Sequence, residues 1–311
     1  MSIPDISKFN DDELVTFLNS FDTILTDCDG VIWILGTPYE GASDAIAAFE
    51  ALGKRVFYVT NNATRPVDNY VKAMTALGYN VTKSQVVNPA VTVEHMLRTR
   101  GVDSKVHLLA SEAFRSHMKE AGVRVTEPRE PSALTLDAVK QHLRALDKDV
   151  GAVVVDFSMT LNYVQLMEVS LLLERPDCLF IAGATDHDLP VEPDITLIGP
   201  GYIVDMLSQF TRRQPLMAAK PSRAVHEVVA ARCPQMDPKR TLFIGDSLPH
   251  DMGQAALSGF NTLLVLTGVT SREEAENAAP ELRPQFIAPS LKSLVPALRR
   301  VSLAPGLQSN K

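Results

Sequence analysis

Cysteine is scarce in this chain of 311 residues, which has three, at positions 28, 178 and 233. Their odd number and wide spacing argue against a disulfide framework and fit a protein of the reducing cytoplasm. The chain also lacks a block of basic residues, and its formal net charge is −7. Neither nucleic acid nor an anionic membrane surface is therefore expected as a partner.

Long apolar runs are also missing, since none approaches the roughly 20 residues that a membrane-spanning helix needs. The first residues, MSIPDISKFNDDEL, are too acidic and too interrupted for a secretory signal or a transit peptide. The hydrophobic content of 45% and the charged content of 22% are ordinary for a globular protein. We therefore expect a cytoplasmic protein without a membrane partner, built as one large domain or two modest ones.

What the chain does contain is an alternation of short apolar runs with helical patterns. TILTD (23–27), RVFYVTNN (55–62), TLFIGDS (241–247) and TLLVLTG (262–268) are typical of strands that are buried on both faces. Helical patterns between them predict an α/β fold with a Rossmann-like, doubly wound parallel sheet. A second α/β set lies in the middle of the chain. The predicted domains are a core of residues 1–100 and 211–311 and a large inserted α/β cap of residues 101–210.

Polar side chains follow several of these apolar runs. Ligands of open parallel sheets bind beyond the carboxyl ends of the strands, so these side chains are the candidate site. The runs deliver Asp27 and Asp29, then Thr60, Asn61 and Asn62, then Asp246 and Asp251, and finally Lys220 after PLMAA. The sheet is expected to gather carboxylates, a hydroxyl, amides and one ammonium group at one edge.

Such a cluster of carboxylates needs a cation, or protonation of some of its members. Two carboxylates about 4 Å apart repel by about 4 kcal/mol at an effective dielectric constant of about 20. The donors are hard oxygens, and no histidine ends a core strand, so the pattern favours Mg²⁺ over zinc. Magnesium usually completes its shell with water and substrate phosphate oxygens. Thr60 and Lys220 are suited to hold other phosphate oxygens.

Four pieces of sequence, DCDGVIW, VTNNAT, KPS and GDSLPHD, occur in that order along the chain. With them the chain resembles the haloacid dehalogenase superfamily, and within it the branch of p-nitrophenylphosphatase, phosphoglycolate phosphatase and pyridoxal phosphate phosphatase. The resemblance covers the whole predicted core. It implies a Mg²⁺-dependent phosphatase that hydrolyses small phosphomonoesters through an aspartyl phosphate.

The resemblance also implies a role for each matching residue. Asp27 attacks phosphorus and coordinates the metal, and Asp29 is the general acid and base and a metal ligand through its carbonyl. Asp246 completes the metal ligands. Thr60 and Asn61 bind the phosphoryl group, with Asn62 beside them, and Lys220 neutralises charge between nucleophile and phosphate. Asp251 and Gly30 support the site.

The cap offers fewer matches. Its substrate loop is expected within residues 184–201, and no substrate residue of the family can be carried onto that segment. His187 is a possible substrate contact there, with a solvated loop residue as the alternative. The resemblance further implies pairing of two copies through the cap. Cys28 is expected to be a small buried apolar residue, with a redox role as the alternative.

Other functions remain open at this point. A phosphomutase, or a relative that cleaves phosphonates or halides, could use the same core. A catalytically weak binding or regulatory protein could keep the fold without turnover. Asp29 favours phosphoester chemistry, because that reaction needs a general acid. Phosphoglycolate, pyridoxal phosphate and other small esters all remain candidate substrates.

Overall fold

The computed structural model describes residues 2–34, 36–192 and 194–302. The chain divides into two units that alternate along the sequence. The first unit contains Met1–Thr60, Val67–Val87 and Lys220–Lys311, and the second contains Asn61–Pro66 and Asn88–Ala219. The chain therefore passes between the two units four times.

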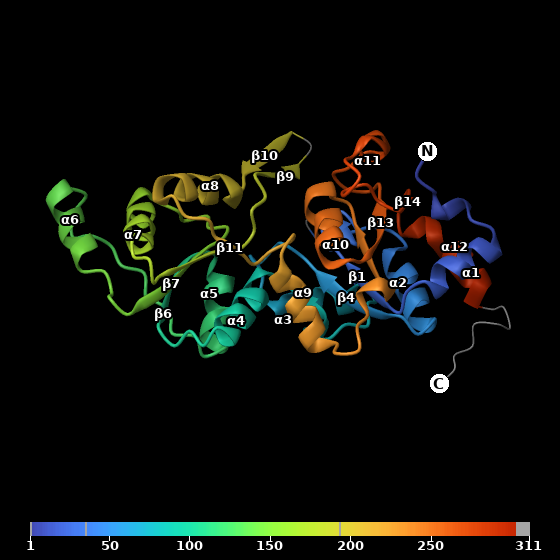
Figure 1. The fold of residues 1–311 in the computed structure, drawn as a ribbon, viewed down its shortest axis with the longest axis horizontal. Helices are drawn as coiled ribbons and strands as arrows, with labels where there is room; N and C mark the ends of the chain where they lie inside the picture. Colours follow the sequence, from blue (N-terminus) through green and yellow to red (C-terminus); the bar gives the residue numbers. More distant parts are fainter. Residues whose placement is uncertain (1, 35, 193, 303–311) are drawn as a thin grey trace. The chain divides into compact units, whose positions relative to one another are not determined.

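A six-stranded parallel sheet forms the centre of the first unit, in the order β14-β13-β12-β1-β4-β5. Successive strands run outward from β1 through β4 to β5 on one side, and outward from β12 through β13 to β14 on the other. The switch point of this doubly wound sheet therefore lies between β1 and β12. In Figure 1, blue strands from the start of the chain join orange and red strands from its end. The strands are β1 (Thr23–Thr26), β4 (Arg55–Val59), β5 (Val86–Val87), β12 (Thr241–Gly245), β13 (Asn261–Val265) and β14 (Phe286–Ala288).

The helices of the first unit bury apolar faces against this sheet. A capping box of Asn10 and Glu13 begins α1, and Gly53 follows α2 in a left-handed conformation with a φ of +78°. Side chains of α1, α2, α3 and α12 share one hydrophobic cluster with alternate residues of the strands. The helices are α1 (Asp11–Asn19), α2 (Ala42–Ala51), α3 (Val67–Ala76), α9 (Arg223–Arg232), α10 (Gly253–Ser258), α11 (Arg272–Asn277) and α12 (Val295–Ser302).

Shorter elements complete the first unit. A small antiparallel pair, β2 (Trp33–Ile34) and β3 (Thr37–Pro38), follows β1. The turn before α10 is a wide helical turn, η4 (Leu248–Met252). Single helical turns also occur at η1 (Ile6–Lys8), at η2 (Lys83–Gln85) before β5, at η3 (Pro238–Arg240) and at η5 (Lys292–Leu294).

The second unit has its own parallel sheet, in the order β11-β8-β7-β6. An antiparallel hairpin of β9 and β10 follows β8. The strands are β6 (Lys105–Leu109), β7 (Val150–Val155), β8 (Leu179–Ala182), β9 (Asp188–Glu192), β10 (Ile195–Ile198) and β11 (Leu216–Met217). The helices are α4 (Pro89–Thr99), α5 (Glu112–Glu120), α6 (Leu136–Arg144), α7 (Tyr163–Leu173) and α8 (Pro200–Thr211).

The structure confirms the α/β class and the doubly wound sheet. By its contacts, helix α4 groups with the second unit, and so does β11. The assignment of residues 101–210 as a functional cap stays a prediction. One expectation is wrong: the run before Lys220 does not enter the sheet of the first unit, because Leu216 and Met217 pair with β8. Lys220 is instead the first residue after the chain returns.

The cysteines and the helices bear on two expectations, that the chain has no disulfide framework and no membrane-spanning helix. Cys28, Cys178 and Cys233 are buried free thiols. None of the helices in the described ranges combines the length and the apolar character needed to cross a bilayer.

Candidate active site

Three strand ends of the first unit meet at the switch point of its sheet. Asp27 directly follows β1, Thr60 directly follows β4 and Asp246 directly follows β12. Strand β1 lies between the other two strands, so the three residues share one edge. The backbone N–H of Asp27 continues the ladder by donating to the carbonyl of Ile244 at 2.9 Å. Thr60 is buried, and its N–H donates to the carbonyl of Val87 at 3.0 Å.

Lys220 lies between two of the predicted site carboxylates. Its Nζ is 2.8 Å from Oδ1 of Asp27 and 2.7 Å from Oδ1 of Asp251. The lysine side chain is 2% exposed, that of Asp27 is 13% exposed and that of Asp251 is fully buried. The ammonium group thus compensates two carboxylates that water reaches poorly.

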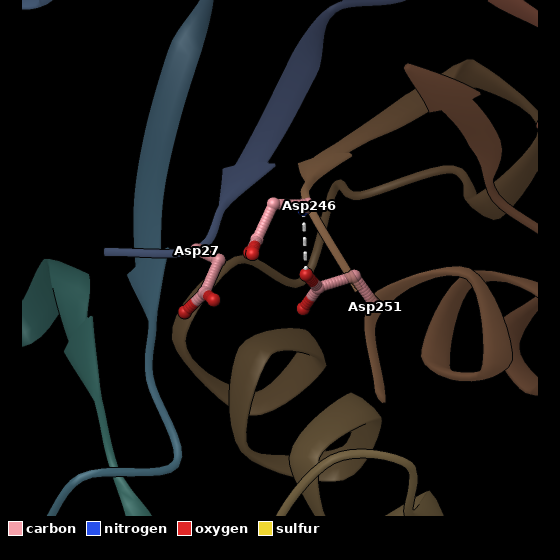
Figure 2. Close-up of side chains that lie close together, drawn as sticks. All are labelled: Asp27, Asp246 and Asp251. Atoms are coloured by element: carbon pink, nitrogen blue, oxygen red, sulfur yellow. Dashed lines mark hydrogen bonds between the residues drawn. The ribbon is translucent and has the colours of Figure 1, made fainter. Parts of the chain in front are cut away.

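Asp251 orients the neighbouring strand end. Its Oδ2 accepts hydrogen bonds from the backbone N–H groups of Asp246 at 2.9 Å and Ser247 at 3.0 Å. Figure 2 shows the first of these bonds and the three carboxylates facing a common space. Because both oxygens of Asp251 have hydrogen-bond partners, its role is to fix Lys220 and the end of β12.

Glycines make room for these carboxylates. A Cβ on Gly30, which has a φ of +87°, would lie 2.4 Å from Oδ2 of Asp246, and one on Gly268 would lie 1.9 Å from the same atom. A Cβ on Gly245 would lie 2.2 Å from Cβ of Asp251. The N–H of Val269 donates to Oδ2 of Asp246 at 2.8 Å. Gly268 and Val269 are therefore contacts of the site that the sequence patterns do not indicate.

Burial and crowding shift the pKa values of these groups. Burial raises the pKa of Asp27 well above its ordinary value, the ammonium of Lys220 opposes this, and the charges of Asp251 and Asp246 reinforce it. Burial and then the charge of Asp251 raise the pKa of Asp246 to about 7. Burial lowers the pKa of Lys220, but the two aspartates more than offset it, so that the net pKa is raised. One ammonium group does not neutralise the cluster.

The donor set fits a hard divalent cation. One ligand atom from each of Asp27, Asp246 and Asp251 lies within 4.8 Å of the other two. Oδ1 of Asp27 accepts a hydrogen bond from the N–H of Cys28 at 2.7 Å and contacts the ammonium group of Lys220. Oδ2 of Asp246 accepts the hydrogen bond from the N–H of Val269. These bonds use one oxygen of each carboxylate. Carboxylate oxygens of this kind are the ligands that Mg²⁺ prefers.

The backbone after Asp27 forms a tight loop around Asp29. The carbonyl of Cys28 accepts from the N–H groups of Val31, Ile32 and Trp33. The carbonyl of Gly30 accepts from the hydroxyl of Thr267 at 2.6 Å. Asp29 is partly exposed in this loop. The loop therefore presents a second carboxyl group two residues after the first, without burying it.

Two neighbours of the site were not singled out by the sequence. The hydroxyl of Tyr39 donates to the carbonyl of Thr267 at 2.8 Å. Burial raises the pKa of Tyr39, and the charges of Asp246 and Asp29 add to this effect. Tyr39 and Thr267 tie the loop after β1 to the loop after β13. Neither belongs to a run of apolar residues followed by an acid, which is the pattern that reveals Asp27 and Asp246.

Cys28 behaves as a buried apolar residue. Its side chain has no exposed surface. Burial, followed by the charges of Asp27 and Asp29, raises the pKa of its thiol well above the ordinary value. This is the opposite of what activates a redox thiol.

The remaining predicted residues, Asn61, Asn62 and His187, belong to the second unit. Oδ1 of Asn62 accepts from the N–H of Thr64 at 2.9 Å and from its hydroxyl at 2.7 Å, which is turn chemistry. His187 Nε2 lies 2.7 Å from Oδ2 of Asp205, and its ring packs edge-on against Tyr202. The predicted loop of residues 184–201 includes position 193, which lies outside the described residues.

The crowding around Asp246 leads to a prediction for Gly30→Ala. We expect its Mg²⁺ affinity to fall about 10- to 100-fold, because the new methyl group would displace the carboxylate of Asp246, which is a predicted metal ligand. Gly78→Ala is the matched control: it has a similar φ of +90° and nothing within 4 Å of the added atom. Calorimetric Mg²⁺ titration of both variants measures the effect. Equal Mg²⁺ affinity of the two variants would contradict the prediction.

Comparison with known proteins agrees with this geometry. A family model described as haloacid dehalogenase-like hydrolase matches residues 24–124, and one described as HAD-hydrolase-like matches residues 217–294. Glycerol-3-phosphate phosphatase of Gallus gallus is 32% identical over 292 residues, which cover 90% of this chain and 93% of that protein. Phosphoglycolate phosphatase 1A of Arabidopsis thaliana, a chloroplastic protein, is 31% identical over 280 residues, covering 89% and 76%.

Solved structures share the fold. Glycerol phosphate phosphatase from Mycobacterium tuberculosis, solved in complex with magnesium, matches with a TM-score of 0.74 at 28% identity, covering 93% of this chain and 80% of that one. The 4-nitrophenylphosphatase from Thermotoga maritima matches with a TM-score of 0.75 at 23% identity, covering 90% and 98%. With the strand-end carboxylates and the buried lysine in place, the chain belongs to the haloacid dehalogenase-like hydrolase family and is one of its phosphatases.

Proposed function

We propose that this protein is a Mg²⁺-dependent phosphatase that hydrolyses small phosphomonoesters through an aspartyl phosphate on Asp27. The observation that carries the proposal is the contact of Asp27 with Lys220 at 2.8 Å, beside the carboxylates of Asp246 and Asp251. Phosphoryl transfer needs positioning and charge neutralisation above all. An aspartate whose Oδ1 is held by Lys220 and the N–H of Cys28 is positioned as a nucleophile.

In the proposed mechanism Oδ2 of Asp27 attacks phosphorus while Asp29 donates a proton to the leaving oxygen. Asp29 then takes a proton from the water that hydrolyses the acyl phosphate. Lys220, Thr60 and the backbone at Asn61 hold the transferring group. Asp27, Asp246 and the carbonyl of Asp29 would hold the metal. Bound there, Mg²⁺ would neutralise charge on the phosphoryl oxygens and on the crowded carboxylates.

The proposed substrates are small, because a large cap is expected to close over the site and exclude bulk water. The relatives are named for glycerol 3-phosphate and phosphoglycolate, so these two esters head the panel that we propose, followed by pyridoxal 5′-phosphate. p-Nitrophenyl phosphate serves as the reporter. An intact phosphoprotein is expected to be a poorer substrate than any of these esters.

The proposal predicts complete dependence on a divalent cation. Release of inorganic phosphate from the panel is expected with Mg²⁺, to stop with EDTA, and to return when excess Mg²⁺ is added. Turnover that persists after chelation and dialysis would rule out the metal dependence. If no ester turns over at saturating Mg²⁺, the alternative of a binding protein on the same fold gains support.

A homodimer that forms through the cap is also proposed. Helix α8 exposes Tyr202, Met206 and Phe210, which recur every four residues along one side of the helix. Sedimentation velocity of the full chain and of a Phe210→Glu variant tests the pairing. A wild-type protein that sediments as a monomer at micromolar concentration would exclude it.

A further inference from the structure

The segment that follows Thr60 is held by side chains of the second unit. Residues Asn61–Pro66 group with that unit. Nδ2 of Asn61 donates to Oδ2 of Asp186 at 3.3 Å, and the hydroxyl of Ser111 donates to the carbonyl of Ala63 at 3.0 Å. The peptide bond between Thr60 and Asn61 is therefore one of the four points at which the chain passes from one unit to the other.

Asp186 is itself held in place from behind. The N–H of Gly201 donates to the carbonyl of Asp186 at 3.0 Å, and the N–H of Gly199 donates to the carbonyl of His187 at 2.6 Å. A Cβ on Gly199 would lie 2.0 Å from the carbonyl oxygen of Asp186, and one on Gly201 would lie 2.4 Å from that of Thr185. The two glycines thus let the start of α8 press directly against the loop that carries Asp186.

A buried carboxyl group fixes the other side of the same loop. Oδ2 of Asp156, which is 3% exposed, accepts from the N–H of Ala184 at 2.8 Å. Ala184 lies two residues after the end of β8 and two residues before Asp186. Hydrogen bonds on both sides of Asp186 therefore fix the backbone from which its carboxylate reaches the amide of Asn61.

We propose that Asp186 is a positioning residue for phosphate binding and acts through Asn61. This inference rests on the proposed function, in which the backbone at Asn61 receives the phosphoryl group. By holding the Asn61 side chain, Asp186 sets the orientation of the peptide between Thr60 and Asn61.

A double-mutant cycle separates this role from others. Asp186→Ala and Asn61→Ala are each expected to weaken the binding of inorganic phosphate about tenfold and to raise KM by the same factor, because each removes one charge-assisted hydrogen bond. The double variant is expected to be no worse than either single variant, since both act on the same bond. Asp186→Asn keeps an acceptor oxygen and is expected to recover most of the affinity.

Several results would overturn the proposal. An Asp186→Ala variant with unchanged phosphate affinity would do so, and so would effects that multiply in the double variant, which is the result expected if Asp186 contacts substrate directly. Asp103→Ala, an exposed aspartate of the second unit, is the control and is expected to leave KM unchanged. Thermal unfolding confirms that each variant folds.

The same experiment distinguishes failure of the proposed function. If neither the wild type nor the control hydrolyses any ester, the phosphatase assignment of this site fails. Calorimetric titration with inorganic phosphate and Mg²⁺ still compares the four proteins of the cycle. A loss of phosphate affinity shared by both single variants supports the positioning role even then, and equal affinities in all four proteins reject it.

Discussion

Asp27→Asn is expected to lower kcat at least about a thousandfold, because an amide does not form the acyl phosphate on which the proposed reaction depends. The fold is expected to survive. The amide oxygen can still accept from Lys220 and from the N–H of Cys28, and the change removes one negative charge from a crowded, buried group of carboxylates. Steady-state turnover of p-nitrophenyl phosphate and thermal unfolding without metal measure the two effects.

The control for this variant is Asp12→Asn, which alters an exposed aspartate in the first turn of α1. Its turnover is expected to equal that of the wild type. An Asp27→Asn variant that keeps a tenth or more of the wild-type kcat would contradict the assigned nucleophile. An inactive variant that also fails to fold would show instead that Asp27 is needed for stability.

Lys220→Met is expected to produce the largest loss of stability, about 3–5 kcal/mol in the free energy of unfolding of the metal-free protein. The substitution leaves Asp27 and Asp251 buried without their shared cation. Activity is expected to fall with it, since the proposed reaction needs the ammonium group beside the phosphoryl group. Chemical denaturation at neutral pH measures the first effect.

Two further variants show whether the loss comes from uncompensated charge. Asp251→Asn in the Lys220→Met background removes one buried charge, and its amide oxygen can still accept from the N–H groups of Asp246 and Ser247. This double variant is expected to be more stable than Lys220→Met alone. Lys83→Met breaks an exposed ion pair with Asp68 and is expected to cost less than about 1 kcal/mol. A double variant no more stable than Lys220→Met would indicate lost packing.

The parts of the site that could be predicted lie where a strand and its acid are adjacent in sequence. Asp27 and Asp246 each follow an apolar run directly, and parallel strands necessarily bring their carboxyl ends to one edge. The fold class follows from the same alternation of apolar runs and helical patterns. These inferences need only local sequence and the geometry of a parallel sheet.

Other parts depend on contacts that local sequence does not record. The N–H of Val269 binds Asp246, but a backbone donor has no residue type to reveal it. The run at Leu216 and Met217 is equally apolar whichever sheet it joins, so its pairing with β8 could not be inferred. Thr60 and Asn61 are neighbours in sequence, yet Asn61 groups with the second unit, where its amide donates to Asp186, more than a hundred residues away.

Trapping of the phosphorylated enzyme tests the central claim most directly. Enzyme that is turning over p-nitrophenyl phosphate with Mg²⁺ is quenched in acid, which preserves acyl phosphates, and the digested chain is analysed by mass spectrometry. We predict a phosphoryl group on the peptide that contains Asp27, absent from the Asp27→Asn variant and lost on treatment with hydroxylamine. A phosphoryl group on a different residue, or rapid turnover without any covalent phosphate, would contradict the account.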